Sequence, residues 1–365
     1  MAVFIGGGIV TLPNAFYTTG LIAGEAIMIC VGILTVNRAW LYMKAKDFIP
    51  GKPESMYEIG YYLFGRPIIF MISFMLCLLN FGTIIGLLKI FGGICGSLII
   101  DFFPDIVDSG WKWLTYDSFW MIGLCVAISP VCLKKEIEEL YIVTVLLFMA
   151  IMSFFGVLFV QFVVFGRSEF SRGEPLTIGN IWTPKTSDNV FLDMVPPLTL
   201  MIFCFAFTSN LFPIYSALRD KTNENGLKVF GIATCLAIFT FSGVSMLGIM
   251  IFGKNVTLNA GNLISNINEE VRHNESGKGH WEAFLLRALY FVIIVTHVPP
   301  IFFPGKEAVL IMIDEIDRRS ISNTLEERIK QLKLKEANES YDEDELDGSM
   351  KDEIEVAGRV SASGT

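Results

Sequence analysis

Long apolar runs dominate the chain and leave few ways for it to fold. A helix needs about 20 apolar residues to cross the ~30 Å hydrocarbon core of a bilayer. Eight runs approach or exceed this length, at residues 2–16, 19–42, 65–100, 117–132, 139–165, 193–217, 228–252 and 282–313. Charged residues make up only 18% of the chain, against ~25% in soluble domains. We therefore predict an all-α polytopic membrane protein.

The negative charge of the chain is concentrated at its C-terminus. Of the formal net charge of −9, −7 lies from Asp314 onward, where there are 15 acidic and 8 basic residues. The rest is nearly neutral, which argues against a nucleic-acid-binding surface. Residues 1–313 are predicted to form a transmembrane domain. Residues 314–365 are predicted to be an acidic cytoplasmic tail or loop, with a short amphipathic helix at NTLEERIKQLKLK followed by disorder.

Polar loops between the runs indicate how the chain is oriented. The loops after the second, fourth and sixth runs, the first of which reads KAKDFIPGKPESMYEIG, concentrate lysine and arginine. Such loops face the cytoplasm in most membrane proteins. The loop at residues 253–279 then faces outward or into a lumen. It carries two N-glycosylation acceptors, Asn255 and Asn274, which we predict to be modified.

Chemistry-bearing side chains form no pattern typical of an enzyme. All seven cysteines lie within or at the ends of apolar runs, and none are spaced as metal ligands. No Ser–His–Asp arrangement is evident, and two of the three histidines lie in the 253–279 loop or directly after it, at His273 and His280. We predict neither catalytic residues nor a cofactor or metal, and the chain is not expected to be an enzyme.

Three adjacent glycines, Gly6, Gly7 and Gly8, interrupt the first apolar run. The stretch IGGGIVTLP has three interpretations: a signal peptide, a close-packing face between helices, or a helix broken within the membrane. No lysine or arginine precedes it, which argues against the signal peptide. A polar Thr-Ser-Asn interrupts the sixth run, before Pro213. By itself this is equally typical of a proline kink, but interruptions in runs one and six suit an inverted repeat.

Three motifs resemble the amino acid/auxin permease family. GGGIVTLPNAFYTTGLIAG is similar to its first-helix signature, FCFAFTSNLFPIYSALRDKT to its sixth helix, and PPIFFPGKEAVLIMI to its eighth. The similarity extends in order and spacing over most of residues 4–313. It implies a LeuT-type inverted-repeat fold of the APC superfamily, with about 8 of an expected 11 spans present. The chain therefore looks truncated at both ends.

The resemblance also implies a substrate site and a mode of action. Secondary transport of amino acids by alternating access is expected, with the substrate held at the unwound first and sixth helices. The implied substrate-binding residues are Gly6, Gly7, Gly8, Ile9, Phe207, Thr208 and Ser209. A non-transporting amino acid sensor that signals through its cytoplasmic tail is the alternative. The implied partners are an amino acid and the lipid bilayer, in a plasma, vacuolar or lysosomal membrane.

Departures from the family pattern bear on the coupling ion. Sodium-coupled members tend to have an asparagine where this chain has Ala2. They also favour a hydroxyl before the eighth-helix proline, where this chain has Thr296 followed by His297. An ionisable residue within a span is a functional candidate, although a histidine that hydrogen-bonds between helices is an equal alternative. We expect coupling to H⁺ or Na⁺ through Thr296 and His297, with H⁺ slightly favoured.

Overall fold

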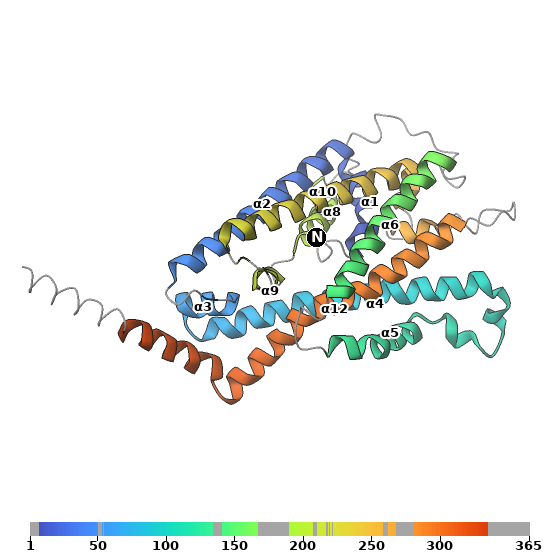
Figure 1. The fold of residues 1–365 in the computed structure, drawn as a ribbon. Coiled ribbons are helices and arrows are strands. Elements are labelled where there is room, and N and C mark those ends of the chain that lie inside the picture. Colours follow the sequence, from blue (N-terminus) through green and yellow to red (C-terminus); the bar gives the residue numbers. More distant parts are fainter. Residues whose placement is uncertain are drawn as a thin grey trace, which may run out of the picture. The chain divides into compact units, whose positions relative to one another are not determined.

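The computed structural model of the chain is almost entirely helical (Figure 1). It describes residues 7–49, 53, 55–133, 141–166, 190–206, 210–216, 218, 220, 222–257, 262–267 and 281–334. The chain divides into two compact units. One comprises Met1–Met43 and Phe74–Val309, and the other comprises Lys44–Ser73 and Leu310–Thr365.

Five of the described helices are long and apolar enough to cross a membrane. They are α2 (Leu21–Phe48), α4 (Pro67–Phe102), α6 (Tyr141–Phe165), α10 (Asn223–Phe252) and α12 (Trp281–Asp317). Two shorter apolar helices are α5 (Asp117–Cys132) and α8 (Val190–Cys204). In a hydrocarbon core a helix satisfies all its backbone polar groups within one segment. The described residues are those of an all-α polytopic membrane protein.

The first and sixth predicted runs each contain two short helical pieces. In the first, a 3₁₀ turn, η1 (Gly7–Val10), precedes α1 (Leu12–Thr19). Pro13 lies in the first turn of α1, where its missing N–H is not needed, and Gly20 follows the last turn with φ 79°. In the sixth run, α8 ends at Cys204 and the helix breaks at Phe205 and Ala206. A second helix, α9 (Leu211–Ser216), follows, and residues 207–209 lie outside the described residues.

Within the first unit, α12 runs antiparallel to α4. Three ring pairs join the two helices in opposite sequence order: Phe81–Phe302, Phe91–Phe291 and Phe102–Phe284. Near the last pair, Arg287 Nη1 donates to Asp101 Oδ2 at 2.5 Å, and the two side chains are only 4% and 17% exposed. Aromatic packing and a buried ion pair therefore fix the register of α12 on α4.

The second unit is organised around a buried carboxylate at the end of α12. Glu315 has a fully buried side chain and accepts a hydrogen bond from Arg66 Nε at 2.6 Å. It also accepts from Ser322 N at 3.1 Å and from the Ser322 hydroxyl. Ser322 belongs to a helix at residues 320–334, which contains most of the segment predicted as amphipathic. The carboxylate therefore anchors the first turn of this helix.

Helix 320–334 also contacts α3 (Met56–Phe64), which lies in a segment expected to be a loop. Tyr61 OH donates to Glu326 Oε1 at 3.1 Å, and Arg328 Nη1 lies 3.8 Å from Glu58 Oε2. Burial, followed by the hydrogen bond to Glu326, raises the pKa of Tyr61 above its usual value. These contacts add a second attachment to the one at Glu315.

Candidate functional site

The glycine-rich turn of the first run lies against the end of α8. Both η1 and α1 contact α8 and α10, and Figure 1 shows α1 among these helices. A Cβ atom placed on Gly8 would lie 2.6 Å from Cys204 Sγ, about 1 Å closer than a comfortable contact. Only a residue without a side chain fits here with the thiol in place. The two interrupted runs therefore meet at their breaks.

The backbone at Gly8 is held by local hydrogen bonds and buried neighbours. Thr11 donates to Gly8 O from its N at 3.1 Å and from its Oγ1 at 3.0 Å. The side chains of Ile9 and Val10 are fully buried. Ends of short helical segments leave N–H and C=O groups without partners inside the helix. A zwitterionic ligand can form hydrogen bonds with such groups, its carboxylate with the N–H groups and its ammonium with the C=O groups.

The end of α8 closes in two tight turns. Phe205 N donates to Ile202 O at 3.1 Å, and Ala206 N donates to Phe203 O at 3.0 Å. The Phe205 ring is buried and packs edge-on against Phe241 of α10, with 5.7 Å between centroids. Because the last carbonyls of a helix carry partial negative charge, this end suits a cationic group.

One cation already contacts this end. Arg38 of α2 donates from Nη2 to Phe205 O at 3.1 Å, and its side chain is partly buried. The sequence prediction of the site did not include Arg38. The available signal was an arginine within the predicted span 19–42, four residues from its end, since ionisable residues within spans are costly and usually functional.

Three of the seven predicted substrate-binding residues lie in the described part of the chain. Gly7, Gly8 and Ile9 form most of η1. The other four fall outside the described residues: Gly6, Phe207, Thr208 and Ser209. Asn210, which follows the break, is only 4% exposed. The structure brings the η1 residues to the break, and substrate binding by all seven remains a prediction.

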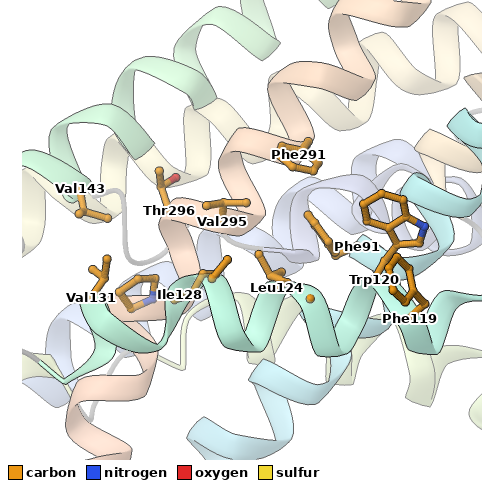
Figure 2. A pocket seen from close by; sticks show the side chains of 13 residues that line it. Phe91, Phe119, Trp120, Leu124, Ile128, Val131, Val143, Phe291, Val295 and Thr296 are labelled. Carbon is orange, nitrogen blue, oxygen red and sulfur yellow. The ribbon is translucent and has the colours of Figure 1, made fainter. Parts of the chain in front are cut away.

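Thr296 lines an apolar cavity of about 490 Å³ between α4, α5, α6 and α12 (Figure 2). The cavity walls include Phe91, Trp120 and Phe291, and none of the described lining residues is charged. Thr296 Oγ1 donates to Val292 O at 2.7 Å, so its hydrogen is engaged within its own helix. This apolar surface suits neither an ion nor a zwitterion, and ion coupling through Thr296 remains a prediction.

His297 is buried on a different side of α12. Successive helical residues are about 100° apart, whereas residues seven apart share a face. Tyr290, seven residues earlier, packs against Phe154 of α6 with 6.0 Å between ring centroids. His297 is 2% exposed, and Nδ1 has no hydrogen-bond partner among the described residues. An unpartnered buried ring nitrogen is a potential proton acceptor.

One of the two predicted glycosylation acceptors is in the described part of the chain. Asn255 lies in a 3₁₀ turn, η7 (Gly253–Thr257), directly after α10, and is partly exposed. The hydroxyl of Thr257, the third residue of the acceptor, donates to Lys254 O at 2.9 Å. Asn274 lies outside the described residues. Modification of both remains a prediction.

Metal-ligating side chains do not cluster in the described residues. In that part of the chain, no group of three or more His, Cys, Asp or Glu residues is placed to hold a metal ion. The seven cysteines are free thiols, and Cys95 and Cys204 are buried. Cys204 therefore acts at the break through its volume and packing.

Comparison with known proteins identifies the family. Residues 1–337 match the family described as "Transmembrane amino acid transporter protein". The chain belongs to this family. The resemblance seen in the three sequence motifs is thereby confirmed. Family members are transporters rather than enzymes, and the chain is a multi-pass integral membrane protein.

Two curated relatives are amino acid transporters of Saccharomyces cerevisiae. Vacuolar amino acid transporter 7 is 24% identical over 274 residues, which cover 72% of this chain and 49% of the relative. Vacuolar amino acid transporter 6 is also 24% identical over 274 residues, covering 71% of this chain and 55% of the relative. The chain spans about half the length of the curated relatives that it matches.

Proposed function

We propose that the protein carries out secondary active transport of amino acids by alternating access. The observation that supports this most directly is the contact between Gly8 and Cys204, because it joins the two interrupted runs. Paired interruptions in the first and sixth spans are expected of a LeuT-type inverted repeat. Family membership supports the substrate class. Both the LeuT-type arrangement and the mechanism are part of this proposal.

Helix ends at the break are suited to the two charges of an amino acid. The N-terminal end of α1 presents partial positive charge, which favours a carboxylate. The C-terminal end of α8 presents partial negative charge, which favours an ammonium group. In our proposal the substrate bridges these ends beside Gly8. Because the backbone then recognises the groups common to all amino acids, side-chain selectivity comes from neighbouring side chains.

Uptake of radiolabelled amino acids into proteoliposomes tests the proposal. Uptake should require an imposed H⁺ or Na⁺ gradient and collapse when an ionophore dissipates it. Gly8→Val should abolish uptake, because its side chain would occupy the space next to Cys204. Gly231→Val is the matched control, since no described atom beyond the local helix backbone lies within 4 Å of a Cβ at Gly231. Undiminished uptake by Gly8→Val would refute a substrate site at this turn.

We propose His297 as the coupling residue, with H⁺ as the coupling ion. Its burial and unpartnered Nδ1 support this role. In a His297→Gln variant, uptake driven by a pH gradient should be lost, while counterflow exchange of labelled for unlabelled substrate should persist. Uptake that follows a sodium gradient and is unaffected by His297→Gln would favour Na⁺ instead.

A vacuolar or lysosomal location is proposed from two observations. The curated relatives are named as vacuolar transporters. Asn255 lies in the loop that the positive-inside bias assigns to the lumen. Sensitivity of the expressed protein to an N-glycosidase, lost on Asn255→Gln together with Asn274→Gln, would support luminal exposure. Co-fractionation with the plasma membrane would argue against the vacuolar location.

The packing of helix 320–334 favours one alternative function, that of an amino acid sensor. Buried contacts at Glu315 and Ser322 tie this helix to the end of α12. A sensor would bind an amino acid without transporting it and would signal through the tail. Binding without flux, together with a cytoplasmic partner that is lost when residues 320–365 are deleted, would favour this alternative.

A further inference from the structure

Two residues of α2 contact the chain on both sides of the break in the sixth run. Before the break, Arg38 Nη2 donates to Phe205 O at 3.1 Å. After the break, the Tyr42 ring meets Phe212 of α9 edge-on, with 6.4 Å between centroids. Residues four apart lie on the same face of a helix. One face of α2 therefore contacts both the end of α8 and the start of α9.

The Arg38 contact has the chemistry of a helix cap. Phe205 directly follows the last residue of α8, where carbonyls lack intrahelical partners and carry partial negative charge. A guanidinium is always charged, and its hydrogen bonds are strengthened in a low-dielectric interior. An arginine within a span is unfavourable without such a partner. The contact thus gives the Arg38 guanidinium a hydrogen-bond acceptor and gives the Phe205 carbonyl at the end of α8 a donor.

The capped carbonyl is one residue from the proposed substrate site. Cys204, whose Sγ lies against Gly8, immediately precedes Phe205. The Phe205 ring packs edge-on against Phe241 of α10, and this contact restricts rotation of the C-terminal end of α8. A displacement of the Phe205 carbonyl would therefore also displace Cys204 relative to η1.

We propose that Arg38 is a positioning residue that caps the C-terminal end of α8 and so keeps Cys204 against Gly8 of η1, while Tyr42 of the same helix packs on α9. For transport this inference rests on the proposed function. Its structural part, the placement of Cys204 against Gly8, is independent of whether the protein transports. Two measurements separate these parts.

The first measurement is the kinetics of proteoliposome uptake. Arg38→Met should raise KM about tenfold, equal to ~1.4 kcal/mol, because the site is no longer held in the binding geometry. A merely structural role would reduce the amount of folded protein and lower Vmax without moving KM. Arg38→Lys, which keeps the charge, should restore most of the affinity. Lys44→Met is the matched control, since it removes an equal charge from an exposed position on the same helix.

The second measurement is alkylation of Cys204 by a membrane-permeant maleimide. The other six cysteines are first replaced by serine, so that the buried Cys204 thiol is the sole target. Arg38→Met should speed this reaction several-fold relative to both the parent and Lys44→Met, because the loosened end of α8 exposes the thiol. Arg38→Gln, which removes the same charge but keeps a polar side chain, should show the same change if Arg38→Met does not fold.

The outcomes distinguish the two proposals. Absent uptake by the parent protein with faster alkylation of the Arg38 variants would refute transport and support the cap. Parent uptake with unchanged KM and unchanged alkylation in Arg38→Met and Arg38→Gln would overturn the cap. An equal rise in Lys44→Met would also overturn it, because the effect would then follow from charge alone.

Discussion

Substitution of Gly8 by alanine tests the geometry of the candidate site most directly. The added Cβ would lie 2.6 Å from Cys204 Sγ, and among the described residues this sulfur is the only atom beyond the local backbone within 4 Å of it. Gly8 is not among the glycines with positive φ, so alanine can adopt its backbone conformation without strain. The substitution therefore isolates a single steric contact.

The expected magnitude follows from this contact. Favourable separations between heavy atoms are about 3.5–4.0 Å, so the overlap is roughly 1 Å. Overpacking of this kind costs about 1–3 kcal/mol. Because Cys204 is only 7% exposed, its thiol has little free space into which to rotate. We expect Gly8→Ala to lower the free energy of unfolding by that amount and to reduce uptake in parallel.

A second substitution makes the prediction specific. Cys204→Ala removes the sulfur and by itself should cost about 1 kcal/mol of lost apolar burial. Combined with Gly8→Ala it should restore stability, giving a coupling energy of about 1–2 kcal/mol between the two positions. Thermal unfolding of purified protein in detergent, followed by tryptophan fluorescence, measures the three variants without a thiol-reactive dye. Strictly additive losses in the double variant would refute the contact.

Three further predictions concern packing elsewhere in the chain. Gly248→Ala should lower the midpoint of thermal unfolding, because its Cβ would lie 2.9 Å from the ring of Pro13 in α1. Gly231→Ala on the same helix should be neutral or should stabilise the protein by up to ~1 kcal/mol. Equal midpoints for the two variants would contradict this packing. Asp101→Asn should lower the free energy of unfolding by about 3–5 kcal/mol, because it leaves Arg287 buried without its counter-ion. A decrease below ~1 kcal/mol, which is typical of exposed ion pairs, would be inconsistent with the burial of this pair. Glu315→Gln should weaken the attachment of helix 320–334 by about 1.5–3 kcal/mol, and trypsin should therefore cleave this helix faster. An unchanged cleavage rate would show that the carboxylate does not anchor the helix.

Local sequence signals predicted the helices better than the loops. Apolar length indicated α2, α4 and α12 to within a few residues, except that α2 extends beyond the predicted 19–42 to Phe48. The segment that contains α3 was expected to be a polar loop. Its Ser55 accepts a hydrogen bond from Glu58 N at 3.3 Å, a capping pattern that was visible as Ser-x-x-Glu. Short helices are missed because apolar length carries no information about them.

Candidate site residues also fall into two groups: those with a local sequence signal, and those whose contacts are distant in the sequence. The glycines of η1 were predicted because interruption of an apolar run is visible within a few residues. Arg38 was not predicted, because its partner Phe205 is 167 positions away in sequence. Thr296 and His297 were predicted as a pair, yet consecutive helical residues point in different directions. Thr296 lines the apolar cavity, whereas His297 is buried and is not among the residues that line it.

The sequence by itself determined that the chain is a bundle of membrane helices with two interrupted runs. Apolar length, glycine and proline act through the backbone of one segment, and a bilayer forces each segment to satisfy its own hydrogen bonds. Only the tertiary structure decided that Gly8 meets Cys204, that Arg38 caps α8, and that Glu315 anchors helix 320–334. These contacts depend on which helices lie together and how each is rotated, and that is set by the packing of all of them at once.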